Sequence, residues 1–303
     1  MSPIDVRLLG RAGENVKIPK PSKKTKMRIA VIGAGPGGIS AAWHLTLKRH
    51  TAVLFDTGDT LGGKISSVIP GSRIPKKTLK AELNRVKKVI SNIKLNQEVN
   101  NTEFLKIKYD YDFTIVAAGS KRSRSLPVPG IERAVFANDF LESSKKDQSV
   151  PGKKVVIIGA GNVGCDVATE AHRLGAEEVT MIDVQEPAAF GKEKEDAQSI
   201  GAIFRWPCFT KKITKKGVVL QDGEFLKADT VVISIGDIPD LDFLDETITL
   251  ENGFITVDQF NRTSDPRVFA IGDVVGPGLI TDAIGAGRRA ALNIDRIIGG
   301  KTP

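Results

Sequence analysis

Two glycine-rich motifs of the form G-x-G-x-x-G are the residues of this chain whose spacing points most directly to chemistry. The first runs from Gly33 to Gly38 and the second from Gly159 to Gly164. In such a motif the first glycine permits a tight turn from strand to helix, the second lets the backbone approach a pyrophosphate, and the third lets the helix pack on the strand. The phosphates then meet the free N–H groups at the positive end of the helix dipole. Each motif therefore predicts a bound dinucleotide.

The elements that must position these glycines are present around both motifs. A strand-like apolar run precedes each motif, Ile29–Ile32 in one case and Val155–Ile158 in the other, and a helix-like segment follows. The next strand ends in a carboxylate, Asp56 or Asp183, which can accept hydrogen bonds from ribose hydroxyls. A single motif is weak evidence, since it also fits a tight glycine turn in an ordinary α/β protein. Two complete units favour two bound dinucleotides, and therefore electrons passing between them.

Length and composition agree with this interpretation. The 303 residues suggest roughly two domains, and a hydrophobic fraction of 41% with 30 glycines suits an α/β protein with many turns. The formal charge of +8 comes from 44 basic and 36 acidic residues. Many basic residues form dispersed pairs, which we expect to be solvated surface; the alternative is steering of anionic partners such as nucleotides and acidic electron carriers. We recognise no nucleic-acid-binding module and expect no nucleic-acid partner.

Cysteine and histidine usage excludes several other chemistries. The two cysteines, Cys165 and Cys208, are far apart and form no C-x-x-C, so this chain alone supplies neither a local redox dithiol nor the ligands of an iron–sulfur cluster. The three histidines lack metal-ligand spacing, and we expect no metal site. No apolar run approaches the roughly 20 residues of a membrane-spanning helix, and the N-terminus lacks a signal-like core. We therefore expect a soluble, cytoplasmic protein without a membrane partner.

The order of elements suggests a loose internal duplication. A basic lead-in occupies residues 1–26, and apolar residues at helical spacing predict a helix over 76–91. Buried-type strands at 111–119 and 229–236 each close on a glycine, one after each motif. A later strand closes on Ala-Ile-Gly-Asp at 270–273, ahead of a C-terminal helix.

With these motifs in this order, the chain resembles the flavoproteins that have two dinucleotide-binding domains. The resemblance implies an α/β protein of two Rossmann-like domains, with the NAD(P)-binding domain inserted into the FAD-binding domain. It implies that the first motif takes the ADP half of FAD, that the second takes NAD(P)H, and that Asp273 bonds a flavin ribityl hydroxyl. The expected divisions are a basic arm at 1–26, the first part of the FAD domain at 27–119, the NAD(P) domain at 120–249, and the second part of the FAD domain at 250–303.

A narrower resemblance rests on the segments Ile18–Pro21, Leu61–Gly63 and Ile69–Pro75. They are similar to the glutamate synthase small subunit and its relatives, including the flavin half of dihydropyrimidine dehydrogenase and bifurcating transhydrogenase subunits. Lys64 and Arg73 are expected near the flavin or its phosphates, with solvated surface as the alternative for each. The expected FAD site comprises Gly33, Gly35, Pro36, Gly37, Gly38, Asp56, Gly63, Lys64, Arg73, Ala118, Gly119, Gly272, Asp273, Thr281 and Ala283. The expected nicotinamide-nucleotide site comprises Gly159, Gly161, Asn162, Val163, Gly164, Asp183 and Gly236.

The chain departs from these relatives in two respects. They carry a cysteine-rich domain with two [4Fe–4S] clusters before the FAD motif, where this sequence has the basic arm, so we expect electrons to pass to a separate protein. Many NADPH-using relatives place two arginines just after the second acid-ended strand, where this chain has Asp183 and Glu186. Those carboxylates would repel a 2′-phosphate, which favours NADH. Lys192 and Lys194 lie close enough to this position in the sequence for NADPH to remain an alternative.

The leading hypothesis is an FAD-dependent NAD(P)H oxidoreductase subunit that exchanges electrons, in either direction, with an iron–sulfur subunit or a ferredoxin in a hetero-oligomeric complex. Hydride transfer between the two cofactors requires no catalytic acid or base from the protein. One alternative is a stand-alone diaphorase or small-substrate reductase. Another is a docking subunit that binds FAD without turnover. A disulfide reductase is disfavoured because the cysteine pair is missing.

Overall fold

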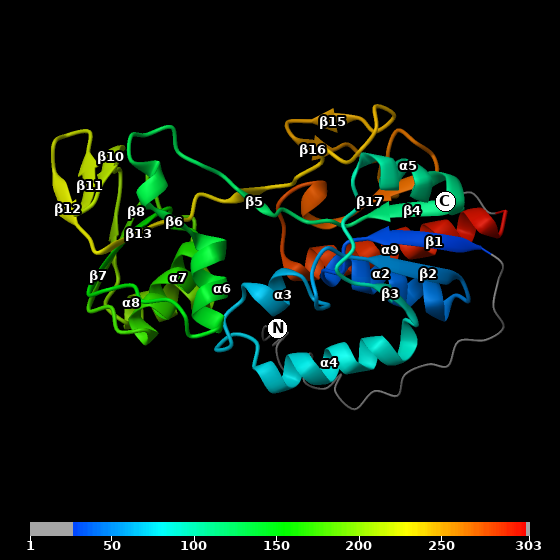
Figure 1. Cartoon of the computed structure of the whole chain (residues 1–303), viewed down its shortest axis with the longest axis horizontal. Helices are drawn as coiled ribbons and strands as arrows, with labels where there is room; N and C mark the ends of the chain where they lie inside the picture. Colours follow the sequence, from blue (N-terminus) through cyan, green and yellow to red (C-terminus); the bar gives the residue numbers. More distant parts are fainter. Residues whose placement is uncertain (1–26, 301–303) are drawn as a thin grey trace, which may run out of the picture.

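The computed structural model describes residues 27–300, which form two α/β units (Figure 1). The first unit is built on a five-stranded parallel sheet in the order β17-β4-β1-β2-β3. Buried valine, isoleucine and alanine side chains dominate these strands, as expected for a parallel sheet covered on both faces. The strands are β1 (Arg28–Ile32), β2 (Thr51–Phe55), β3 (Asn92–Lys94), β4 (Phe113–Val116) and β17 (Val268–Ala270).

Two helices from opposite ends of the chain pack against each other beneath this sheet. They are α2 (Pro36–Leu47), which begins in the first glycine motif, and α9 (Ile280–Ile298). A Cβ on Gly287 of α9 would collide with the carbonyl oxygen of Gly37, so the two helices approach as closely as glycine allows. The other helices of the unit are α3 (Lys64–Ser67), α4 (Lys76–Val89), α5 (Asn101–Asp110) and the 3-10 turn η3 (Gly272–Val274).

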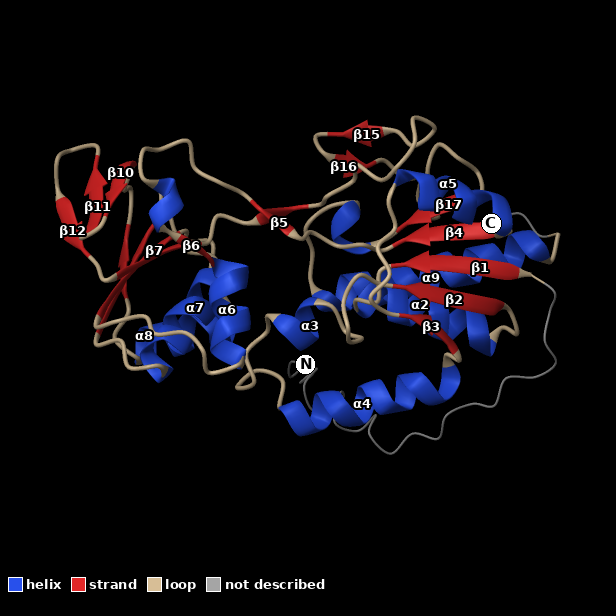
Figure 2. Cartoon of the chain, in the orientation of Figure 1, coloured by secondary structure: helices blue, strands red, loops and turns tan. Residues whose placement is uncertain are grey.

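The second unit repeats this plan with a five-stranded parallel sheet in the order β6-β13-β7-β8-β9. An antiparallel three-stranded sheet, β10 to β12, lies at its outer end (Figure 2). The strands are β6 (Val135–Phe136), β7 (Lys154–Ile158), β8 (Glu178–Ile182), β9 (Ile203–Arg205), β10 (Thr210–Thr214), β11 (Gly217–Leu220), β12 (Phe225–Lys227) and β13 (Thr230–Ile233). The helices are the 3-10 turn η2 (Ile131–Arg133), α6 (Ala137–Lys145), α7 (Asn162–Arg173) and α8 (Gly191–Ser199).

The chain crosses between the units twice, through two short antiparallel strands. β5 (Arg122–Ser123) leads into the second unit and β14 (Asp237–Ile238) leads out of it, and the two strands are hydrogen-bonded to each other. A small hairpin, β15 (Leu250–Glu251) with β16 (Phe254–Ile255), follows in the first unit. The second unit is thus inserted into the first, which confirms the predicted fold class. The helix predicted over 76–91 is α4.

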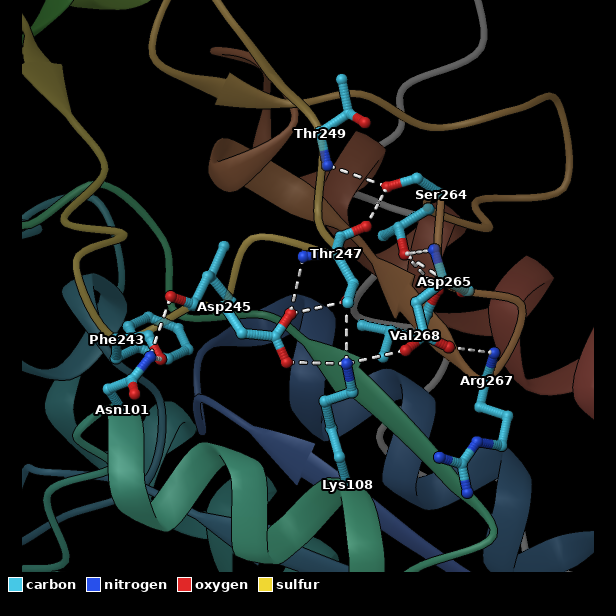
Figure 3. A network of polar contacts seen from close by, with 12 residues as sticks. Asn101, Lys108, Phe243, Asp245, Thr247, Thr249, Ser264, Asp265, Arg267 and Val268 are labelled. Atoms are coloured by element: carbon cyan, nitrogen blue, oxygen red, sulfur yellow. Dashed lines mark hydrogen bonds and ion pairs between the residues drawn. The ribbon is translucent and has the colours of Figure 1, made fainter.

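A polar network joins helix α5 to the segments that follow the return crossing (Figure 3). The ammonium group of Lys108 lies 2.8 Å from Oδ2 of Asp245 and 2.7 Å from Oδ2 of Asp265. It also donates to Oγ1 of Thr247 at 2.8 Å. The three charged side chains are nearly buried, with exposed fractions of 11%, 9% and 12% for Lys108, Asp245 and Asp265. The network therefore holds residues 245–265 on the first unit.

Candidate functional site

The two glycine motifs adopt the same backbone geometry. Gly33 has φ +111° and Gly159 has φ +110°, a region that side chains rarely adopt. A Cβ on Gly33 would collide with the carbonyl oxygen of Ala117, at the end of β4. A Cβ on Gly159 would collide in the same way with the carbonyl oxygen of Ser234, just after β13. Both strand-to-helix turns therefore require glycine at their first position.

The remaining glycines of each motif separate into two roles. A Cβ on Gly38 or on Gly164 would collide with the carbonyl oxygen of the first glycine of its own motif, so helix packs closely on strand there. A Cβ on Gly35 or Gly161 would meet no atom within 4 Å. This open space lies at the N-termini of α2 and α7, where a pyrophosphate can approach the backbone. Both cradles therefore fit the phosphates of a dinucleotide.

The two acid-ended strands also match. Oδ2 of Asp56 accepts a hydrogen bond from the backbone N–H of Ala34 at 2.5 Å, and Oδ2 of Asp183 accepts one from Ala160 at 2.8 Å. Each carboxylate therefore accepts a hydrogen bond from the second residue of its motif. This bond holds both the loop and the side chain in place. The predicted bonds from these carboxylates to ribose hydroxyls remain predictions.

A cavity opens beside each motif, at the carboxyl ends of the parallel strands. The cavity at the first motif measures about 240 Å³, and Asp56 and Gly119 are among its lining residues. The cavity at the second motif measures about 760 Å³, and Asp183 is in its lining. Ligands bind at these strand ends in open α/β sheets. Arg122 and Arg124 also line the larger cavity, from a connecting segment that our sequence analysis did not single out.

Lys64 and Asp273 are brought close together at the junction of the units. The ammonium of Lys64 lies 2.7 Å from Oδ2 of Asp237 on β14. Burial raises the pKa of the Asp273 carboxyl; the charge of Lys64 opposes this shift and that of Asp237 adds to it. The three charges therefore interact, although Asp237 was not among the predicted residues. Contacts of Lys64 and Asp273 with a flavin remain predictions.

Arg73 bridges the two units. Its guanidinium lies 2.8 Å from Oδ2 of Asp166 on α7 and 2.7 Å from Oε1 of Glu193 on α8. Burial raises the pKa of the Asp166 carboxyl to about 6, although Arg73 works against the shift. The structure thus engages Arg73 with the second unit, and its predicted position near the flavin remains a prediction.

The start of α9 lies against the first motif. A Cβ on Gly37 would lie 3.2 Å from the carbonyl oxygen of Ala283, which follows Thr281 by two residues in the first turn of α9. The N–H groups of this turn, predicted to face the flavin, are therefore beside the motif at the positive end of the α9 dipole. Gly272, which precedes Asp273, has φ +71°, and a Cβ on it would lie 3.6 Å from the Cβ of Ala283.

The second motif is fastened to the loop before α8. Oδ1 of Asn162 accepts from the N–H of Phe190 at 2.9 Å, and its Nδ2 donates to Glu193 at 3.3 Å. Val163 is 45% exposed in the first turn of α7. Gly236 has φ +93°, and its carbonyl oxygen accepts a hydrogen bond from the N–H of Arg124 at 2.9 Å. This bond links the two segments through which the chain crosses between the units.

Comparison with known proteins identifies the family. Residues 27–287 match the family described as pyridine nucleotide-disulphide oxidoreductase. The chain belongs to this family. The beta subunit of NADP(+)-dependent formate dehydrogenase from Moorella thermoacetica is 32% identical over 96% of this chain and 46% of its own length. PreT, a subunit of NAD-dependent dihydropyrimidine dehydrogenase from Escherichia coli K12, is 31% identical over 99% of this chain and 76% of its own length.

The glutamate synthase small chain of Mycobacterium tuberculosis is 28% identical over 94% of this chain and 70% of its own length. Lactococcus lactis thioredoxin reductase in its FR conformation superposes with a TM-score of 0.74 at 20% identity, over 91% of this chain and 100% of its own. These matches confirm the resemblance to the glutamate synthase branch and the two-unit fold. FAD and NAD(P)H are the cofactors of this oxidoreductase family.

The two cysteines differ from those of a redox disulfide. Cys165 and Cys208 are free and buried, and burial raises the pKa of the Cys165 thiol to about 12. A thiol with so high a pKa is a poor nucleophile at neutral pH. Within residues 27–300, no three histidine, cysteine or acidic side chains are grouped as metal ligands. No helix in that same range is long and apolar enough to span a membrane.

Proposed function

We propose that this chain transfers electrons between NADH and an iron–sulfur protein through FAD, in either direction. The proposal is carried by the pair of matching cradles, each with open space above its second glycine and a cavity at its strand ends. Two such sites in one chain suit a relay from one dinucleotide to another. FAD supplies the chemistry, because it accepts a hydride and can release electrons one at a time.

The protein contributes binding and orientation. The glycine turns let phosphates reach the N-termini of α2 and α7, and Asp56 and Asp183 hold those turns through backbone hydrogen bonds. Orienting two reactants in one complex can supply much of the rate of a transfer between them. The ion pairs of Lys64 and Arg73 hold the units in the arrangement described above.

NADH is the preferred nucleotide in this proposal. Asp183 lines the larger cavity, where its carboxylate would repel a 2′-phosphate but can accept from a 2′-hydroxyl. Lys192, a cation that kept NADPH open, is paired with Asp196 at 2.5 Å. Lys194, whose charge acts on Cys165 beside the second motif, and Arg122 and Arg124 in the cavity lining are the remaining candidates for holding phosphate. The relatives are named for both nucleotides, so their names do not decide the preference.

An iron–sulfur partner is the proposed destination or source of the electrons. The formate dehydrogenase and PreT relatives are both named as subunits of larger enzymes. The two cysteines of this sequence are too few to supply the four thiolates of a cluster. A partner that carries clusters would take the single electrons that a reduced flavin can release.

An anaerobic titration of the purified, FAD-loaded chain with NADH, and separately with NADPH, tests the proposal. The flavin absorbance should bleach with about one equivalent of NADH and require a large excess of NADPH. A flavin that neither nucleotide bleaches would contradict the proposal and favour a structural role for FAD. Fast turnover with quinones or other diffusible acceptors, but none with iron–sulfur proteins, would favour the stand-alone reductase.

A further inference from the structure

Helix α4 carries a stripe of five exposed lysines, Lys76, Lys77, Lys80, Lys87 and Lys88. At 3.6 residues per turn these lysines fall within an arc of about 120°, and the stripe runs about 20 Å along the helix. Leu79, Leu83 and Val86 occupy the arc next to the stripe, and Leu83 and Val86 pack against the core of the first unit. Within residues 27–300, the five lysines are thus exposed from the first turn of the helix to the last.

No acidic side chain within residues 27–300 forms an ion pair with any of the five. Elsewhere on the surface some lysines are paired, as Lys153 is with Glu177 and Lys154 with Glu178. The single acid of α4, Glu82, lies outside the stripe and pairs with Arg85. The stripe is thus an uncompensated block of positive charge.

Helix α4 carries a large excess of positive charge. Helix α4 has six lysines and arginines against one glutamate, which gives it +5 of the formal +8 of the whole sequence. A dispersed surface excess would not produce such a field on one helix. Concentrated charge of one sign attracts a partner of the opposite sign and speeds its association.

Helix α4 belongs to the first unit, where the proposed function places FAD. The segment leading into α4 starts at Gly63, where a Cβ would lie 3.1 Å from Cα of Gly35 in the first motif. The charge of Lys76 lowers the pKa of Lys145, whose ammonium donates to the carbonyl oxygen of Ile65 at 3.0 Å; burial of Lys145 is the larger cause of that shift. The first turn of α4 is therefore near the junction of the units (Figure 1).

We propose that the lysine stripe of α4 is the docking surface for an acidic iron–sulfur protein. This inference rests on the proposed function, which requires such a partner on the FAD side. A nucleic acid is a poorer fit, because α4 has no aromatic side chain on which bases could stack. A membrane surface is a poorer fit, because the apolar face of the helix packs against the core. A second copy of this chain would present the same positive charge.

Charge reversal tests the proposal. The triple variant Lys76→Glu, Lys80→Glu, Lys87→Glu changes the stripe, and Lys212→Glu, Lys215→Glu, Lys216→Glu is the matched control on exposed lysines of the second unit. The probe is an acidic ferredoxin with two [4Fe–4S] clusters. Its NADH-dependent reduction and its binding by calorimetry are measured at 50 mM and 500 mM salt. Reduction of dichlorophenolindophenol by NADH reports the flavin site alone.

The stripe variant should reduce the ferredoxin at least tenfold more slowly than wild type at 50 mM salt, and bind it correspondingly more weakly. The difference should shrink at 500 mM salt, because screening shortens the range of the attraction. The control and the dye assay should stay within twofold of wild type. Equal effects of the two triple variants, no effect of the stripe variant, or failure of the wild type to bind the ferredoxin would overturn the proposal.

The two proposals fail in different assays. If NADH does not reduce the dye in the wild type, the proposed function fails, while calorimetry with the ferredoxin still tests the stripe. Single-stranded DNA and vesicles of anionic lipid serve as further probes. If the stripe variant loses binding to either of these while binding ferredoxin as wild type does, the stripe is not a protein-docking surface.

Discussion

Lys64 and Asp237 join the two units at the return crossing, with the ammonium nitrogen 2.7 Å from Oδ2. Lys64 begins α3, next to the first glycine motif, whereas Asp237 lies on β14 where the chain leaves the second unit. Ser123, on the neighbouring crossing strand, donates to the other carboxylate oxygen of Asp237 at 3.0 Å. Both crossings are therefore tied to the first unit through one carboxylate.

A double-mutant cycle on this pair should give a small coupling. Lys64→Ala and Asp237→Ala should each lower the free energy of unfolding, and the coupling should be about 0.5–1 kcal/mol because Lys64 is 37% exposed. Urea unfolding of the four proteins measures it. Strictly additive losses would show that the contact contributes nothing to stability.

Alanine at the first glycine of each motif should separate the two cofactors. Because a Cβ at Gly33 or Gly159 would collide with a backbone carbonyl oxygen, each substitution should cost at least about 1–3 kcal/mol locally. Gly33→Ala should lose bound FAD, whereas Gly159→Ala should keep FAD but lose bleaching by NADH. Absorbance after gel filtration and after NADH addition measures both. Gly71→Ala, where a Cβ meets no atom within 4 Å, is the neutral control.

Asp166 should make the protein less stable as pH rises. Its pKa is raised to about 6 in the folded protein, from an ordinary value of 3.8, with burial as the main cause. The folded state therefore holds this proton more tightly than the unfolded state. The stabilising contribution is complete below pH 3.8 and is lost as pH rises through 6. Arg73, Glu193 and Glu170 are the charged groups that influence this carboxyl.

Removing the charge of Asp166 should stabilise the protein most at high pH. Asp166→Asn should gain stability relative to wild type by about 1–2 kcal/mol between pH 5 and pH 8, measured by urea unfolding at both values. Asp229→Asn is the control, and its effect should be the same at pH 5 and pH 8. Backbone N–H groups of Lys154 and Lys153 lower the pKa of Asp229 from 3.8, so its contribution is lost only as pH falls below that value. A pH-independent difference for Asp166→Asn would contradict the assignment.

Asp183→Asn should weaken the preference for NADH. Asparagine keeps an oxygen to accept from the N–H of Ala160 but removes the charge that repels a 2′-phosphate. We expect the ratio of kcat/KM for NADH to that for NADPH to fall about tenfold, or roughly 1.4 kcal/mol. Steady-state reduction of the dye with each nucleotide measures the ratio. An unchanged ratio would assign the discrimination to other residues of the cavity.

Lys108→Met should destabilise the first unit. It leaves Asp245 and Asp265 nearly buried without their shared cation, which should cost about 3 kcal/mol. The triple variant that adds Asp245→Asn and Asp265→Asn should recover much of the loss, because no uncompensated charge remains. Thermal unfolding of the three proteins measures both effects. If Lys108→Met is as stable as wild type, the carboxylates of Asp245 and Asp265 find other partners.

The sequence predicted the elements whose structure depends on residues nearby in the chain. The strands before both motifs, the helix at α4 and the acid-ended strands follow from periodicity and from glycine spacing within a few dozen residues. The partners of Lys64 and Arg73 could not be predicted in this way, because Asp237 and Asp166 are distant in the chain and only the packing of the two units brings them near. Arg122 and Arg124 were missed because a two-residue crossing strand has no recognisable period.

The insertion of one unit into the other has a consequence for synthesis. Strand β17 lies beside β4 in the sheet of the first unit, and α9 packs on α2, yet both elements leave the ribosome after every strand of the second unit. The inserted unit can therefore complete its sheet while the host still exposes the open edge of β4. Unpaired strand edges in nascent chains are prone to association. The interval between the emergence of β13 and that of β17 is thus when this polypeptide most needs a chaperone.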